Sequence, residues 1–238
     1  MKRALTVVGT RPDAIKMAPV ILELQRQSDI ETVVVASGQH REMLEQVFSA
    51  FGISADRNFD VMKPGQTLGY LTASILEGMD LAISEIDPDI VIAQGDTTTT
   101  FVAGLSSFYS QKPFAHVEAG LRTPTIDSPF PEEFNRRAIG LITTLHFPPT
   151  MFSAENLFRE GVAAESVLVT GNTSIDAIQL LASNREPFDD SKMILVTTHR
   201  RENWGEPQRD ICKAVVRILD AHPECTVVLP MHRNPIVR

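Results

Sequence analysis

The sequence predicts an α/β protein built around a doubly wound parallel sheet. Short apolar runs alternate along the chain with longer segments whose apolar residues recur every three or four positions. Buried strands that alternate with amphipathic helices are typical of right-handed βαβ units, which place helices on both faces of a parallel sheet. A polar or charged residue follows nearly every apolar run, and sheets of this class bind ligands at the carboxyl ends of their strands. The pattern therefore predicts both the fold and the edge of the sheet that carries the site.

The expected strands are apolar runs bounded by turn-forming or charged residues, at residues 4–8, 32–36, 90–93, 113–117, 145–147, 167–170, 193–197 and 226–229. The expected helices are the segments of helical periodicity between them, from residue 13 onward and at residues 41–51, 64–86, 97–109, 132–144, 151–160, 173–182 and 208–221. The stretch at residues 119–131 contains several prolines and is expected to be a long loop.

Four signals concern the ends of these helices. Pro12 suits the first turn of the first helix, whereas Pro19 should kink or restart it. Asp96 is placed to cap the helix at residues 97–109. Thr173 and Asp176 have the spacing of a capping box.

The chain is expected to contain one complete domain and the start of another. The first domain spans residues 1–182, a polar linker follows at 183–191, and residues 192–238 open a second domain. Two strands and one helix cannot close a sheet or cover its apolar faces. We therefore expect the chain to be the N-terminal portion of a longer protein.

Composition excludes several classes of protein. Of 238 residues, 43% are hydrophobic and 22% are charged, as in ordinary globular proteins, and the net charge of −8 argues against bulk binding of nucleic acid. No apolar run approaches the ~20 residues of a membrane span, and the N-terminal run is too short for a secretory signal. Cys212 and Cys225 lack the spacing of metal ligands and are expected to be reduced thiols of a cytoplasmic protein.

Two carboxylates closely follow expected strands, Asp96 after an intervening Gln94-Gly95. Asp96 comes after the run at 90–93, and Glu118 comes after the run at 113–117. Unpaired buried charges are costly, so carboxylates at the ends of buried strands indicate a functional site. A cap is the alternative role for Asp96, whereas Glu118 precedes Ala119 and Gly120 and is not suited to one.

A third acidic position opens the helix at residues 132–144. Glu132 could face the same crevice as the two strand-end carboxylates. The alternative is that Glu132 and Glu133 simply pair with Arg136 and Arg137 at i,i+4 spacing, which stabilises a helix by only a few tenths of a kcal/mol.

Basic residues lie at other strand ends. Arg11 and Lys16 flank the first strand-to-helix turn, where an anion would meet the helix N-terminus. His199 and His232 each lie in a basic cluster after a strand, which suits phosphate, although isolated histidines are more often structural. The glycine-rich dinucleotide fingerprint is absent, and the histidines lack metal-site spacing, so neither a cofactor nor a metal is expected. The residues alone indicate acid–base chemistry on an anionic, phosphorylated ligand.

Eight motifs, GTRPDAIKMAP, SGQHREML, GDTTTT, HVEAGLRT, SPFPEEFNRR, TGNTSIDA, THRREN and MHRNPIVR, occur along the chain. Together, and in this order, they resemble the non-hydrolysing UDP-N-acetylglucosamine (UDP-GlcNAc) 2-epimerases over essentially the whole chain. The resemblance implies a GT-B fold, in which the active site lies between two Rossmann-like domains, and an isomerase that interconverts UDP-GlcNAc and UDP-ManNAc for cell-envelope polysaccharides. It also implies a homodimer.

The resemblance implies roles for particular residues. Deprotonation at sugar C2, elimination of UDP and its re-addition would use Asp96, Glu118 and Glu132, with no one of them assigned as the base, and His199 would assist departure of the UDP phosphate. The implied substrate-binding residues are Arg11, Lys16, Arg136, His232 and Asn234. A regulatory UDP-GlcNAc site of some members would use Gln39, His40 and Arg41. Glu42 and Gly65 depart from the regulated members, which weighs against allosteric activation.

Two alternatives remain beside the epimerase. A GT-B glycosyltransferase would use the same cleft, but such enzymes hold most nucleotide contacts in the second domain, whereas the three carboxylates here lie in the first. A non-catalytic UDP-sugar-binding remnant is the other alternative, because the second domain is incomplete. Formation of UDP-ManNAc from UDP-GlcNAc without an acceptor would distinguish the epimerase from both.

Overall fold

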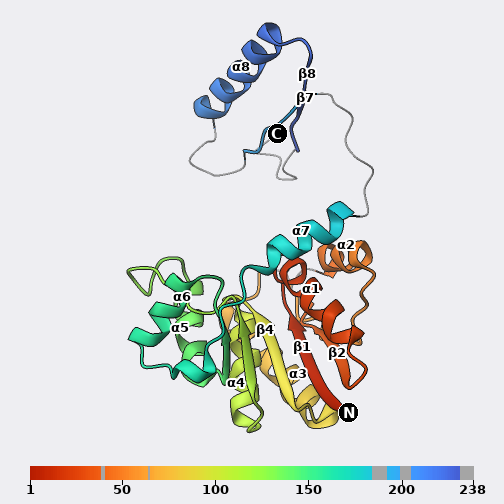
Figure 1. Ribbon diagram of the computed structural model, residues 1–238, viewed down its shortest axis with the longest axis vertical. Helices are drawn as coiled ribbons and strands as arrows, with labels where there is room; N and C mark the ends of the chain where they lie inside the picture. Colours follow the sequence, from red (N-terminus) through yellow and green to blue (C-terminus); the bar gives the residue numbers. More distant parts are fainter. Residues whose placement is uncertain (39–40, 64, 184–191, 199–204, 231–238) are drawn as a thin grey trace. The chain divides into compact units, whose positions relative to one another are not determined.

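The computed structural model describes residues 1–38, 41–63, 65–183, 192–198 and 205–230, without the side chains of residues 41–43. The chain divides into two compact units, Met1–Asn184 and Arg185–Arg238 (Figure 1). Apart from Ser183, the linker expected at 183–191 lies outside the described residues.

The first unit is built on a six-stranded sheet in which every pairing is parallel. Its order is β3-β2-β1-β4-β5-β6, which is the order of a doubly wound Rossmann-like sheet. The fold class predicted from the sequence is confirmed. The chain reverses its direction of winding between β1 and β4, and ligands of doubly wound sheets bind at such a switch point. The strands are β1 (Lys2–Val8), β2 (Ile30–Ala36), β3 (Arg57–Asn58), β4 (Ile90–Gln94), β5 (Phe114–Val117) and β6 (Leu145–Phe147).

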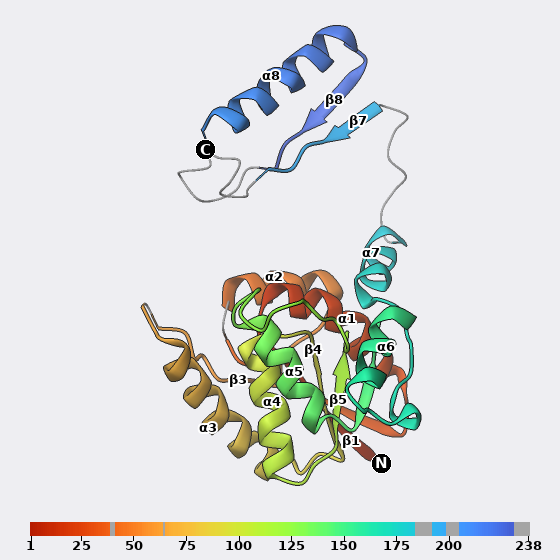
Figure 2. The same ribbon diagram turned by 90° about the vertical axis from the view of Figure 1, so that its left-hand side faces the viewer.

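Helices cover both faces of this sheet, as two separate apolar clusters show (Figure 2). Successive side chains of a strand point to opposite faces. The helices are α1 (Arg11–Arg26), α2 (Arg41–Phe51), α3 (Leu68–Ile86), α4 (Thr98–Tyr109), α5 (Glu132–Ile142), α6 (Met151–Arg159) and α7 (Thr173–Ser183), with a short 3₁₀ helix at Ala164–Ser166. Because of this alternation, Leu5 and Val7 of β1 pack with α3, α4 and α5, whereas Ala4 and Val8 pack with α1 and α2.

Of the two effects expected of Pro19, a kink or a restart of the first helix, the restart does not occur. α1 runs unbroken from Arg11 to Arg26, with Pro12 in its first turn. An internal proline costs a helix about 3 kcal/mol. Here Ala14, Met17, Ala18 and Ile21 are buried on either side of it, and their packing against the sheet outweighs the loss.

Two expected caps are also wrong. Thr97, not Asp96, caps α4, because its Oγ1 accepts a hydrogen bond from Thr100 N at 3.3 Å. α7 begins at Thr173, so that residue is the first helical position and does not cap the helix. The preceding Asn172 accepts through Oδ1 from Ser174 N at 3.0 Å. Asp96 is thereby free for another role.

The strand expected at residues 167–170 is reduced to one bridge, between Val167 and His146. The neighbouring strand β6 is followed by Pro148 and Pro149, which have no amide hydrogen to continue a ladder. Conversely, β3 was not predicted, because its two residues are polar and carry no apolar alternation.

The second unit contains a strand–helix–strand arrangement. β7 (Lys192–Leu195) and β8 (Cys225–Val228) are parallel neighbours, and α8 (Glu206–Ala221) connects them. None of the described residues of this unit is buried. Among the described residues, no helix combines the length and the apolar character that crossing a bilayer requires.

Candidate active site at the switch point

Glu118 follows β5 in a backbone conformation that side chains rarely adopt. Its φ is +65°, in the left-handed region, which costs a residue with a Cβ about 1–2 kcal/mol. The amides of Glu118 and Ala119 both donate to Phe147 O, at 3.0 and 3.3 Å, so the neighbouring strand holds this turn. The conformation allows the Glu118 side chain to reach back over the end of β4.

The carboxylate of Glu118 receives hydrogen bonds from three elements. Lys16 Nζ on α1 lies 2.7 Å from both oxygens. Asn172 Nδ2, just before α7, donates to Oε1 at 3.0 Å, and Gln94 Nε2, at the end of β4, donates to Oε2. The side chain of Glu118 is only 11% exposed, so little of this charge is left to solvent. Charge-assisted bonds of this kind are the stronger ones in proteins.

Asp96 lies beside this cluster, after Gly95. Its carboxylate pairs with Arg136 of α5 at 2.6 Å, and Asn135 Nδ2 donates to its backbone carbonyl at 2.8 Å. Burial raises the pKa of Asp96, and the nearby charges of Glu132 and Glu118 raise it further, while Arg136 opposes the rise. A carboxyl group whose pKa is raised is better matched to proton transfer near neutral pH.

Glu133 rather than Glu132 anchors the ion pairs at the start of α5. Glu133 is fully buried; Arg137 Nε approaches it at 2.7 Å and Arg136 Nη1 at 3.4 Å. Glu132 is half-buried, and its nearby negative charge contributes to raising the pKa of Asp96. The helical ion pair considered as the alternative therefore forms for Glu133, with Arg137 at i,i+4, but its carboxylate is buried, and Arg136 links it to Asp96.

Asp13 is a buried carboxyl group that the sequence analysis did not single out. It forms a capping box with Thr10, accepting from Thr10 N at 3.0 Å, and it also accepts from Thr97 Oγ1 at 3.2 Å. Asp13 therefore ties the turn after β1 to the head of α4. Burial raises its pKa from 3.8 to about 6. The Thr-x-x-Asp spacing was a signal that could have found it.

Two buried histidines support the same edge of the sheet. His116, in β5, bonds through Nε2 to Gly95 O at 2.7 Å, and a carbonyl can only accept, so Nε2 carries the hydrogen. Burial lowers the pKa of His116, and that of His146 in β6, from 6.5 to about 4. Both are neutral near pH 7, and His116 holds the residue that precedes Asp96.

The structure brings together several of the residues expected in the site, namely Lys16, Asp96, Glu118, Glu132 and Arg136. Arg11 is exposed at the first position of α1. Other expected residues lie outside the described part of the chain: Gln39, His40, His199, His232 and Asn234. Arg41 is the first residue of α2, but its side chain is not among those described. Gln94 and Glu133 belong to the cluster without having been predicted as site residues.

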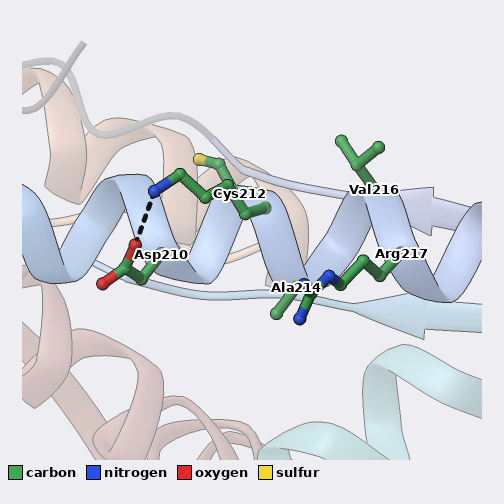
Figure 3. A pocket seen from close by; sticks show the side chains of 6 residues that line it. Asp210, Cys212, Ala214, Val216 and Arg217 are labelled. Atoms are coloured by element: carbon green, nitrogen blue, oxygen red, sulfur yellow. Dashed lines mark hydrogen bonds and ion pairs between the residues drawn. The ribbon is translucent and has the colours of Figure 1, made fainter.

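Within the described ranges, no three His, Cys, Asp or Glu side chains gather in a way that could hold a metal ion. A depression on the second unit is lined by Asp210, Cys212, Lys213, Ala214, Val216 and Arg217 (Figure 3). All six come from α8, and Lys213 donates to Asp210 at 2.9 Å. Groups from several elements do not converge there, and we assign no ligand to it.

The first unit thus defines a Rossmann-like α/β protein with a cluster of carboxylates and bases at its topological switch point. The family model for UDP-N-acetylglucosamine 2-epimerase matches residues 22–238. The chain belongs to this family.

Individual relatives agree with this assignment. The Bacillus subtilis UDP-N-acetylglucosamine 2-epimerase is 47% identical over 242 residues, which cover 99% of this chain and 64% of the relative. A crystal structure of the Neisseria meningitidis UDP-GlcNAc 2-epimerase bound to UDP-GlcNAc is 44% identical with a TM-score of 0.85, covering 99% of this chain and 67% of that one. The S. aureus MnaA–UDP co-structure is 45% identical with a TM-score of 0.84, covering 100% of this chain and 65% of that one. The chain thus spans about two thirds of its relatives' length.

Proposed function

We propose that the protein containing this chain interconverts UDP-GlcNAc and UDP-ManNAc. The observation that carries the proposal is the convergence of Asp96, Glu118, Lys16 and Arg136 at the switch point of a member of this family. Relatives at 44% and 45% identity are described as bound to UDP-GlcNAc and to UDP, which supports a UDP-sugar as the ligand.

The reaction requires a base and an acid at one carbon atom. A carboxylate takes the proton from C2 of the sugar, the bond between C1 and the UDP oxygen breaks, and UDP leaves with the bonding electrons. UDP then returns to C1 while C2 receives a proton on its other face. General acid–base catalysis by positioned carboxyl groups contributes about 10²- to 10⁴-fold to such steps.

The carboxyl groups of the site are not equivalent in this scheme. Glu118 has donors on both oxygens, which suits a fixed charge that orients Lys16. Asp96 forms an ion pair with Arg136 and has a raised pKa, which suits a group that gains and loses a proton. Lys16 and Arg136 supply positive charge close to where the anionic substrate would bind.

The test is incubation of the purified protein with UDP-GlcNAc in D₂O, followed by NMR. UDP-ManNAc with deuterium at C2 is the expected product. Transfer of GlcNAc only when an acceptor sugar is added would favour a glycosyltransferase instead. Tight binding of UDP-GlcNAc without any C2 exchange would favour a binding protein. The homodimer is part of the same proposal, and sedimentation velocity checks it.

A further inference from the structure

Asn172 has an amide whose orientation the structure determines. Its Oδ1 accepts from the backbone amide of Ser174 at 3.0 Å and from the Ser174 hydroxyl. A backbone N–H can only donate, so the oxygen of Asn172 must face Ser174 and its nitrogen must face away. That nitrogen lies 3.0 Å from Glu118 Oε1, although 54 positions separate the two residues.

The place of Asn172 in the fold links two helices to one carboxylate. Asn172 immediately precedes α7, and α7 packs against α1, beside which it lies in Figure 1. Lys16 of α1 donates to the same oxygen, Oε1, at 2.7 Å. Gln94 donates to the other oxygen from the end of β4. The Glu118 carboxylate therefore accepts hydrogen bonds both from residues at the helices α1 and α7 and from a residue of the sheet.

Capping of α7 does not by itself require an amide at this position. Serine and aspartate cap helices as well as asparagine does, because only an acceptor oxygen is needed. The nitrogen of Asn172 is the atom that serves Glu118. The oxygen and the nitrogen of the Asn172 amide therefore have different roles, and a substitution can remove the role of the nitrogen while it keeps that of the oxygen.

We infer that Asn172 is a positioning residue of the active site, which orients the Glu118 carboxylate between Lys16 and α7. This inference rests on the proposed function, since it assumes that Glu118 and the Lys16 it orients belong to the active site. Asn172 acts only through Glu118 and is assigned no contact with the reacting atoms.

The first test is a double-mutant cycle of Asn172→Asp and Glu118→Gln, measured by urea unfolding of this chain at pH 7. Asn172→Asp keeps the oxygen that caps α7 but turns a second carboxylate toward Glu118. We expect it to lower the urea midpoint by roughly 0.5 M in the wild-type background and by much less with Glu118→Gln, because the repulsion is then removed. Equal shifts in both backgrounds overturn the inference.

Asn58→Asp is the matched control. It makes the same exchange of nitrogen for oxygen, and Asn58 Oδ1 likewise accepts from a backbone amide two residues later, that of Asp60 at 3.2 Å. Asn58 lies in β3, which β2, β1 and β4 separate from β5. Its effect should be the same with and without Glu118→Gln. If Asn172→Asp does not fold, Asn172→Ser replaces it, because the serine hydroxyl can still cap α7 but the amide nitrogen that reaches Glu118 is lost. The same requirement holds, that its effect depend on Glu118.

The second test separates positioning from stability. In the epimerase assay, Asn172→Asp should lower kcat by roughly 10- to 100-fold, as expected when Glu118 and Lys16 are misplaced in the active site, while the KM for UDP-GlcNAc changes less than about threefold. An unchanged kcat overturns the inference even if the unfolding cycle shows coupling. Absence of conversion by the wild-type protein contradicts the proposed function instead, and the unfolding cycle then decides the inference.

Discussion

Lys16 Nζ lies 2.7 Å from each carboxylate oxygen of Glu118, although 102 positions separate the two residues. The contact joins the first helix to the end of the fifth strand across the switch point of the sheet. It places a cation and an anion side by side where the loops after β1, β4 and β5 meet. The predictions below concern this edge of the sheet.

Removing either strand-end charge should abolish turnover and spare the fold. Glu118→Gln and Asp96→Asn keep the size of each side chain and remove its charge. We expect each to lower kcat for UDP-GlcNAc epimerisation by at least about 100-fold, because a positioned carboxyl group is lost. NMR measures the rate and circular dichroism the fold. Wild-type turnover in either variant would remove that residue from the chemistry.

Asp13 should make the first unit less stable as pH rises from acidic to neutral. Its carboxyl holds a proton up to about pH 6 when folded but only to 3.8 when unfolded. The stabilisation is therefore complete below pH 3.8 and is lost as pH rises through 6, a change of about 3 kcal/mol. Asn at this position cannot titrate. The free energy of unfolding of wild type minus that of Asp13→Asn should fall between pH 4 and pH 7, and a flat difference would contradict this.

His116 should act in the opposite direction. Its pKa is lowered to about 4 by burial, so the unfolded chain takes up a proton at 6.5 before the folded chain does. The stabilisation is present above pH 6.5 and is lost as pH falls to 4, and the free energy of unfolding decreases by about 3 kcal/mol over this range. His116→Gln keeps an N–H that can donate to Gly95 O and removes the titration. Urea unfolding across this range should show wild type losing stability relative to the variant; parallel curves are the contrary result.

Gly120 should not tolerate a side chain, although a comparable glycine should. Gly120 has φ +82°, and a Cβ there would lie 2.2 Å from Ser153 O in α6. Gly161 has φ +86°, but a Cβ there would meet nothing within 4 Å. Gly161→Ala should therefore cost only the backbone strain of about 1–2 kcal/mol, whereas Gly120→Ala should cost about 4 kcal/mol or more. Thermal unfolding of both variants checks this, and equal losses would mean that α6 shifts freely.

The sequence by itself determined the order and type of most elements. The helix at 41–51 and the strand at 145–147 begin and end where the apolar pattern placed them, because local periodicity and turn residues decide such boundaries. It also located Asp96 and Glu118 at strand ends, since a carboxylate directly after a buried run is visible in the chain itself. The eight motifs predicted the family, and the comparisons confirm it.

Only the tertiary structure decided which groups meet. That Glu118 contacts Lys16, Gln94 and Asn172 depends on β1 lying beside β4 and on α7 packing against α1. Likewise, the buried partner of Arg136 and Arg137 is Glu133, while Glu132 stays half-buried near Asp96. Strand order and helix packing bring together residues far apart in the chain. Hydrogen bonds also depend on side-chain directions, which the apolar periodicity of the sequence does not specify. For that reason the sequence could indicate where the candidate site lies, whereas the pairing of its residues came only from the structure.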